Sequence, residues 1–369
     1  MNYRVPFVAY PEHYRRLAGE IDCAIKRVLT GGDLILRDDV CRFEKGIASF
    51  LGMDYAVGTN SCTDAMLLSL RAAGIGPGDE VITVSHTFVA TVAAIVHCGA
   101  IPVLVDIGSD FNMDVTHLET AISPKTRAIM PVHLNGRCCD MDRLMAVASA
   151  HNLIVIEDAA QALGASVAGR KASTFGLAGC FSFYPAKLLG AFGDAGIVVT
   201  NDKGLAEQIS LLRNHGRETK DDIGLFGYNS RLDNLQAAIL NVKLQYVPKW
   251  IERRREIAGF YHEGLSGIEH LILPAPPETE GRYFDVYQNY VIRSGERERL
   301  IDHLTRRGIE ILVSLAKPVH RQAALDLGHF CLPVTEQVSE EVLSLPMYPE
   351  LSNEQVEYVI ESVRQFYKR

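Results

Sequence analysis

The sequence predicts an α/β fold with a largely parallel sheet, followed by a smaller α+β domain. From about residue 55 to 200, short β-rich runs alternate with helical stretches: YAVG leads to DAMLLSLRAAG, EVITV to FVATVAAIVHCG, AIMPVHL to MDRLMAVASAHN, and LIVIEDAA comes next. Apolar strands that are each followed by a crossover helix predict a parallel sheet covered on both faces. The composition agrees, because 47% hydrophobic and 22% charged residues are typical of a globular protein.

The predicted sheet ends with GCFSFYP and GIVVTND, two strand candidates that flank Lys187. A long helical stretch from about 234 to 265 follows, and Pro248 is expected to interrupt or bend it. We therefore expect a large domain at 1–247 and a small C-terminal domain at 248–369.

Three segments carry the strongest patterns in the expected small domain. VYQNYVIR predicts a strand, and ERERLIDHLTRRG predicts a helix that ends at Gly308. The last segment, SNEQVEYVIESVRQFYKR, predicts a helix that opens with Ser352 and Gln355 at the spacing of a capping box.

Charge and cysteine content exclude several classes of partner. The net charge of −8 argues against a general affinity for nucleic acid or anionic membranes. The eight cysteines show no CxxC spacing, so we expect neither a disulfide framework nor a metal site, and we treat Cys138 and Cys139 as ordinary thiols.

The N-terminus lacks an apolar signal segment, and no apolar run reaches the roughly 20 residues that a membrane span needs, so a cytoplasmic location is expected.

The segment GTNSCTDAMLLSL has the form of a phosphate-binding turn. A strand ends near Gly58, and the hydroxyl residues Thr59, Ser61 and Thr63 precede a helix. Helix N-termini present unpaired N–H groups to anions, so this junction is able to hold a phosphate. Taken alone, the segment favours ordinary N-capping of the helix over phosphate binding.

Two charged residues are expected to share one cleft. In the segment VIEDAAQALGA, Glu157 and Asp158 are the last residues of an apolar strand. They are expected at the same sheet edge as the predicted phosphate turn. Lys187 stands between the apolar run FSFYP and the small-residue run LLGAFGDAG, where an unpaired ammonium is costly to bury. The alternatives are a capping role for Asp158 and a lysine that extends to solvent.

A phosphate turn, a strand-end aspartate and a partly buried lysine together match what pyridoxal 5'-phosphate requires. The lysine must be neutral to attack the aldehyde, and partial desolvation lowers its pKa toward that state. An aspartate beside the ring nitrogen keeps that nitrogen protonated, which lets the ring accept electrons. We therefore expect this cofactor from the residue types alone.

Six motifs in order resemble the DegT/DnrJ/EryC1/StrS family of pyridoxal-phosphate-dependent sugar aminotransferases. They are FEKGIASFLGMDYAVGTNSCTDAMLLSL, GIGPGDEVITVSHTFVATVAAI, IEDAAQALGA, FSFYPAKLLGAFGDAG, GYNSRLDNLQAAIL and LSLPMYPELSNEQVEYVI. The resemblance covers essentially the full chain. It implies the aspartate aminotransferase-like fold, known as fold type I.

The resemblance also implies roles around the cofactor ring. Lys187 would hold the cofactor covalently and move the proton during transfer, and Asp158 would pair with the pyridine nitrogen. Gln161 would hydrogen-bond near the ring hydroxyl. Phe88 would stack on the ring face, although the residues alone favour plain core packing for it.

The resemblance implies phosphate contacts from two subunits. Ser61, Cys62 and Thr63 would bind the phosphate at the helix start, together with Ser182. Asn229, in GYNSR, would reach the phosphate of the neighbouring subunit. Without the resemblance, the local sequence favours a simple turn asparagine equally well. A homodimer with shared active sites follows from the trans contact.

Two positions depart from the family pattern. Asn135 stands where many members have tyrosine, and Arg37 stands where a glycine is common. Both are expected near the sugar rather than the cofactor, so they leave the identity of the nucleotide and the sugar open.

The expected function is transfer of an amino group, from L-glutamate, to C3 or C4 of a nucleotide-linked deoxysugar. 2-Oxoglutarate would be the other product. The alternatives are another fold-type I reaction, a dehydratase or a desulfurase, and a non-catalytic cofactor-binding regulator. Lys187 disfavours the dehydratase, because that branch of the family has histidine in its place, and a desulfurase needs a reactive cysteine.

Overall fold

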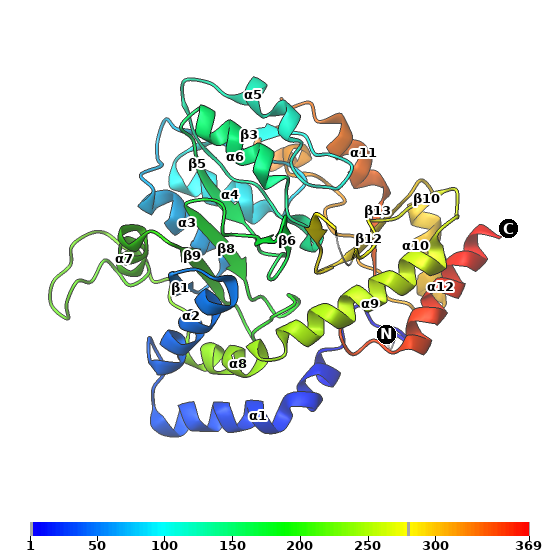
Figure 1. The fold of residues 1–369 in the computed structure, drawn as a ribbon, viewed down its shortest axis with the longest axis horizontal. Coiled ribbons are helices and arrows are strands. Elements are labelled where there is room, and N and C mark those ends of the chain that lie inside the picture. The colour runs from blue at the N-terminus through cyan, green and yellow to red at the C-terminus, as the bar shows by residue number, and fades with distance from the viewer. Residues whose placement is uncertain (1–2, 279–280, 369) are drawn as a thin grey trace.

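The computed structural model describes residues 3–278 and 281–368. A seven-stranded sheet with the order β1-β9-β8-β5-β4-β2-β3 forms its centre (Figure 1). Only β9 runs antiparallel to its neighbours β1 and β8, and the remaining pairs are parallel, which confirms the predicted largely parallel sheet. The strands are β1 (Tyr55–Thr59), β2 (Glu80–Val84), β3 (Ile101–Val105), β4 (Thr126–Ile129), β5 (Ile154–Asp158), β8 (Ala178–Ser182) and β9 (Gly196–Thr200).

Helices cover both faces of this sheet, because alternate strand residues point to opposite sides. Ile197 and Val199 pack into a core shared with α1, α2, α6 and α8, whereas Val198 between them packs with α3, α4 and α7. The helices of this part are α1 (Tyr10–Gly31), α2 (Asp38–Leu51), α3 (Cys62–Ala72), α4 (Val89–Cys98), α5 (Leu118–Ala121), α6 (Met141–Ala150), α7 (Lys203–Leu212) and α8 (Asn234–Leu244).

The predicted long helix is two helices. α8 ends at Leu244 and α9 (Val247–Leu265) begins three residues later, with Pro248 in its first turn. Proline fits there because the first helical N–H groups have no partner within the helix. α9 leads from the large sheet to the C-terminal residues (Figure 1).

The C-terminal residues form a three-stranded antiparallel sheet, β10-β12-β13, with its own core. The predicted capping box at Ser352 and Gln355 is confirmed. Val5 pairs with Ile309 and packs in this core, so the first described residues lie with the C-terminal part; the boundary after residue 247 stays a prediction. The elements are β10 (Leu271–Ile272), β12 (Tyr290–Ser294), β13 (Val342–Leu345), α10 (Arg297–Arg306), α11 (Pro333–Glu341) and α12 (Asn353–Tyr367).

The strand prediction for VYQNYVIR is wrong in its first half, because β12 begins only at Tyr290. Tyr287 has a φ of 48°, which breaks the extended conformation, and Val286 N–H bonds to Gly136 O. Val286 packs in a core of the large sheet, whereas Tyr287 packs in the core of the small sheet, so the chain crosses between the two parts here.

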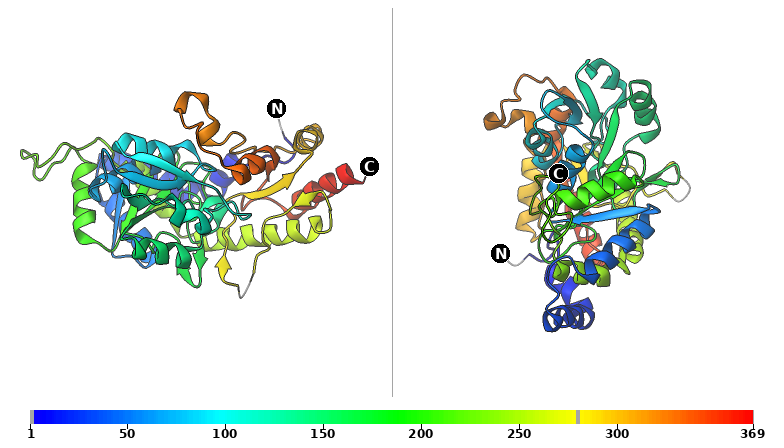
Figure 2. Two further views of the ribbon diagram at one scale, coloured as in Figure 1. Left: turned by 90° about the horizontal axis from the view of Figure 1, so that it is seen from above. Right: turned by 90° about the vertical axis from the view of Figure 1, so that its left-hand side faces the viewer.

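A small sheet with the order β11-β6-β7 connects the two parts (Figure 2). Among the described residues, no helix has the length and apolar character that crossing a bilayer requires. The remaining elements are β6 (Ser166–Val167), β7 (Arg170–Lys171), β11 (Tyr283–Phe284) and the 3-10 helices η1 (Val115–His117), η2 (Leu134–Gly136), η3 (Val319–Arg321) and η4 (Ala323–Leu325).

Candidate active site

A cavity of about 620 Å³ lies at the carboxyl edge of the parallel strands. Residues of the N-terminal segment and of the C-terminal part, including Phe7, Met347 and 312–315, complete its wall. Eight of the nine predicted site residues line it: Ser61, Cys62, Thr63, Phe88, Asp158, Gln161, Ser182 and Lys187.

Asp158, the last residue of β5, is 4% exposed and has its carboxylate fixed by two donors. Thr91 donates its hydroxyl to one oxygen at 2.7 Å, and Ala160 N–H donates to the other at 3.1 Å. Thr87 is hydrogen-bonded to Thr91 at 2.8 Å, so a row of hydroxyls leads to the carboxylate. No motif in the sequence marked Thr91, which lies one helical turn after Phe88.

The neighbouring Glu157 points to the opposite face of the sheet and holds the strand end in place. Its buried carboxylate accepts the N–H groups of Ser173, at 2.7 Å, and of residues 175 and 176. His133 donates Nε2–H to it at 2.8 Å, because Nδ1 accepts the N–H of Cys139 and carries no proton. A buried carboxylate with four donors is fully satisfied, so Glu157 acts as a structural anchor for β5.

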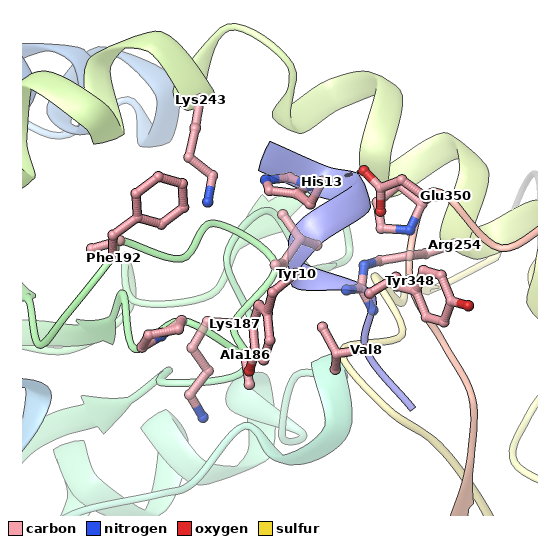
Figure 3. Close-up of a pocket in the computed structure, with 15 residues that line it drawn as sticks. Val8, Tyr10, His13, Ala186, Lys187, Phe192, Lys243, Arg254, Tyr348 and Glu350 are labelled. Carbon is pink, nitrogen blue, oxygen red and sulfur yellow. Dashed lines mark hydrogen bonds and ion pairs between the residues drawn. The ribbon is translucent and has the colours of Figure 1, made fainter. Parts of the chain in front are cut away.

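Lys187 lies on a tight turn between β8 and β9. Its own N–H bonds to Tyr184 O at 2.8 Å, and the turn closes so tightly that a Cβ on Gly190 would lie 2.3 Å from Pro185 O. Burial lowers the pKa of Lys187 below the usual lysine range, and the negative charge of Asp158 opposes part of that decrease. Figure 3 shows the amine directed away from a second, smaller cavity behind the turn, near Lys243.

The predicted phosphate turn forms the N-terminus of α3, with Ser61 as its N-cap. Ser61 Oγ accepts the N–H of Asp64, and the first intrahelical bond is donated by Ala65, which leaves the N–H groups of Cys62 and Thr63 available to an anion. Thr63 therefore lies inside the helix rather than before it. Thr59 donates its hydroxyl to Ser61 O at 2.9 Å and is buried away from the cavity.

β9 packs directly behind this helix start. A Cβ on Gly196 would lie 2.3 Å from the carbonyl carbon of Ser61, so only glycine lets the strand approach so closely. Ser182, at the end of β8, accepts Tyr184 N–H at 3.3 Å and faces the same cavity.

Phe88 is 68% exposed and lines the cavity, so the core-packing interpretation is wrong. Its hydrophobic ring therefore lies at the wall of the cavity that Asp158 and the start of α3 also line. Composition does not reveal this, because an aromatic residue next to an apolar helix usually packs inside.

Gln161 lies next to one of the two positions that depart from the family pattern. Its Oε1 accepts Asn135 N–H at 2.8 Å, and Asn289 donates its side-chain amide to Asn135 Oδ1 at 3.3 Å. Asn289, which no motif in the sequence predicted as a site residue, reaches the cavity from the C-terminal part. Arg37, the other departing position, precedes α2, pairs with Asp33 at 3.4 Å and does not line this cavity.

Asn229 is the predicted site residue that the fold leaves outside the cavity. It is exposed, in a segment between α7 and α8 that projects from the molecule (Figure 1). The nearby Phe226 is fully exposed and Ile223 is 56% exposed. Within the described residues, no group of three or more His, Cys, Asp or Glu side chains is arranged to hold a metal ion.

Comparison with known proteins places the chain in a family. A model of the DegT/DnrJ/EryC1/StrS aminotransferase family matches residues 16–364. A "pleiotropic regulatory protein" of Geobacillus stearothermophilus is 42% identical over 99% of this chain and 99% of its own length. The dTDP-3-amino-3,4,6-trideoxy-alpha-D-glucose transaminase of Streptomyces venezuelae is 42% identical over 99% of this chain and 97% of its own length.

Two solved structures share the fold over almost the whole chain. DesV of S. venezuelae, in complex with a ketimine intermediate, has a TM-score of 0.96 at 42% identity and covers 100% of this chain and 99% of its own. The PLP form of the putative sugar aminotransferase Spr1654 of Streptococcus pneumoniae has a TM-score of 0.88 at 27% identity and covers 95% of this chain and 96% of its own. These likenesses confirm the fold that the six motifs implied, and the chain belongs to the DegT/DnrJ/EryC1/StrS aminotransferase family.

Proposed function

We propose that this protein is a pyridoxal-phosphate-dependent aminotransferase that moves an amino group from L-glutamate to a keto carbon of a nucleotide-linked deoxysugar. The observation that carries the proposal is the convergence of Lys187 and Asp158 on one cavity at the N-terminus of α3. The S. venezuelae relative supports the substrate class, and its name favours C3 over C4 as the carbon that is aminated.

The residues fit the cofactor. The available N–H groups of Cys62 and Thr63, with Ser182 nearby, suit a phosphate, and the exposed ring of Phe88 offers a stacking surface. When bound, pyridoxal phosphate supplies an aldehyde that takes up an amine and a ring that accepts electrons from the reacting carbon.

The side chains divide the remaining work. Lys187 Nζ, with its lowered pKa, is available as the neutral amine that attacks an aldehyde and then moves a proton to or from the substrate carbon. Asp158 holds a proton at the ring nitrogen, and the hydroxyl of Thr91 fixes the orientation of that carboxylate. Gln161 offers a hydrogen-bonding group at the ring hydroxyl.

The assembly that we propose is a homodimer with shared sites. Exposed Asn229 and the apolar side chains of Ile223 and Phe226 form a projecting segment suited to reach a second copy of the chain. Hybrid dimers test this: mixing Lys187→Met with Asn229→Ala subunits restores one intact site only if Asn229 acts in trans. Activity of the mixture no higher than that of the separate variants would contradict the trans contact. The cytoplasmic location stays a prediction.

The competing functions lose support at specific residues. Cys62 is the one cysteine among the described residues that lines the cavity, and burial raises its pKa well above the usual range, which makes it a poor desulfurase nucleophile. The presence of Lys187 disfavours the dehydratase. The name of the G. stearothermophilus relative favours a regulatory role. Measured turnover would argue against that role, and the absence of turnover would argue for it.

The test has two steps. The protein is incubated with pyridoxal phosphate and borohydride, and the modified peptide is identified by mass spectrometry; we expect the adduct at Lys187. The loaded protein is then given L-glutamate, with 2-oxoglutarate measured, followed by a panel of nucleotide ketosugars whose aminated product is identified. An adduct at another lysine would overturn the site, and a Lys187 adduct without any turnover would favour the regulator.

A further inference from the structure

The side chain of Gln288 grips the turn that carries Lys187 on both sides. Its Oε1 accepts Leu188 N–H at 2.7 Å, and its Nε2 donates to Ala186 O at 2.9 Å. These are the peptide groups directly after and directly before Lys187. Gln288 is 7% exposed, and its side chain lines the same cavity as Lys187.

The backbone of Gln288 is itself anchored from the C-terminal part. Arg254, on α9, donates Nη1 to the carbonyl oxygens of Tyr287, Gln288 and Met347 at 3.0–3.1 Å. Arg254 is 5% exposed and lines the smaller cavity beside Glu350 and Tyr348 (Figure 3). A side chain that is fixed at its own backbone has less freedom to lose when it binds a second segment.

We propose that Gln288 is a positioning residue, which sets the backbone of Lys187 and so aims its amine into the cavity. The inference rests on the proposed function, because it assigns Gln288 to the reaction of Lys187. Two hydrogen bonds to adjacent peptide groups fix both position and rotation of the intervening residue. A shift of the amine by about 1 Å is enough to slow a proton transfer by about 10²-fold.

The chain offers a matched control on the same turn. Gln236, on α8, makes a similar pair of hydrogen bonds, but both go to a single residue further along the turn, Phe192. Its Oε1 accepts Phe192 N–H at 2.9 Å, and its Nε2 donates to Phe192 O at 3.3 Å. Phe192 lies five residues beyond Lys187 and outside the large cavity. Gln236→Leu therefore removes an equal number of bonds without touching the peptide groups beside Lys187.

The first measurement needs no cofactor. In the cofactor-free protein, hydrogen exchange of Leu188 N–H is compared in wild type, Gln288→Leu and Gln236→Leu. We expect at least a tenfold faster exchange in Gln288→Leu alone. Unchanged protection of Leu188 in Gln288→Leu would overturn the clamp.

The second measurement separates positioning from stability. We expect Gln288→Leu to lower kcat about 10- to 100-fold while KM for L-glutamate changes less than threefold, with Gln236→Leu close to wild type. Gln288→Glu keeps the acceptor for Leu188 and loses the donor for Ala186, so it reports on one bond if the leucine variant fails to fold. Wild-type kcat in both Gln288 variants, or an equal loss in Gln236→Leu, would refute the inference. Failure of wild type to form the Lys187 adduct would instead refute the proposed function, and the Leu188 exchange result would stand.

Discussion

Two lysines are withdrawn from water on opposite sides of one turn, and only one of them faces a large cavity. Lys187 opens into the 620 Å³ cavity, and its Nζ has no hydrogen-bond partner among the residues that the structure describes. Lys243, on α8, is 3% exposed and donates to Gly190 O behind the turn, beside a cavity of about 40 Å³. Figure 3 shows the amine of Lys243 directed toward the turn and the amine of Lys187 directed away from it on the far side.

The comparison shows that burial alone does not make a lysine reactive. Burial lowers the pKa of both amines, that of Lys243 to about 8. Lys243 uses its amine to hold Gly190, whereas Lys187 keeps its amine free beside Asp158 and the helix N-terminus. The two lysines differ because the amine of Lys187 faces a large cavity and has no hydrogen-bond partner within the described part of the chain. A reaction requires both features, and a structural contact requires neither.

The largest expected effect separates the two lysines by turnover. Lys187→Met removes both the proposed point of covalent attachment and the proposed proton carrier, so we expect turnover to fall by about 10³-fold or more. Lys243→Met leaves the cavity intact and is expected to stay within tenfold of wild type. Steady-state rates with L-glutamate measure both, and an equal loss in the two variants would break the distinction.

The second prediction concerns the pH dependence of stability. Lys243 has a folded pKa of about 8 against 10.5 for a free side chain, so between these values the unfolded chain binds a proton that the folded chain does not. The free energy of unfolding of wild type should therefore rise with pH through this window, by on the order of 3 kcal/mol relative to Lys243→Met. Denaturant unfolding at pH 7 and pH 10.5 measures the difference. The exposed Lys249 provides the control, since Lys249→Met should leave the pH dependence of wild type unchanged.

The smallest expected effect tests the turn that separates the two lysines. Gly190→Ala places a methyl group 2.3 Å from the backbone oxygen of Pro185, so the turn must shift and stability should fall by about 1–3 kcal/mol. Gly193→Ala meets only the end of the Gln236 side chain, at 3.0 Å, and should cost much less. Thermal unfolding measures the stability of the two variants. An equal loss of stability in both would show that the turn tolerates the added methyl group at residue 190.

Local patterns predicted much of the fold and four of the residues that line the cavity: Ser61, Thr63, Asp158 and Lys187. The family resemblance supplied Cys62, Phe88, Gln161 and Ser182. Alternating apolar strands and helices indicated the sheet, and the end of β5 placed Asp158 at the carboxyl edge that parallel strands share. The capping box at Ser352 was also readable, since its two partners are three residues apart.

The errors arose where distant segments decide the local structure. VYQNYVIR has the composition of a strand, yet in its first half Gln288 bonds to Leu188 and Ala186 on the Lys187 turn. Arg254 holds the carbonyl oxygen of Gln288 from the other side. Phe88 is an aromatic residue of the type that usually packs in a core, and only the assembled cavity leaves it exposed.

The sequence by itself determined the order of the elements, the family and the chemistry that we propose for Lys187 and Asp158, because these depend on residue type and on spacing within a few residues. Only the tertiary structure decided which lysine keeps a free amine and which glutamine holds it in place. Contacts between segments a hundred residues apart, such as Gln288 with Leu188, leave no periodic trace along the chain. They exist only once the packing of both cores has brought the segments together.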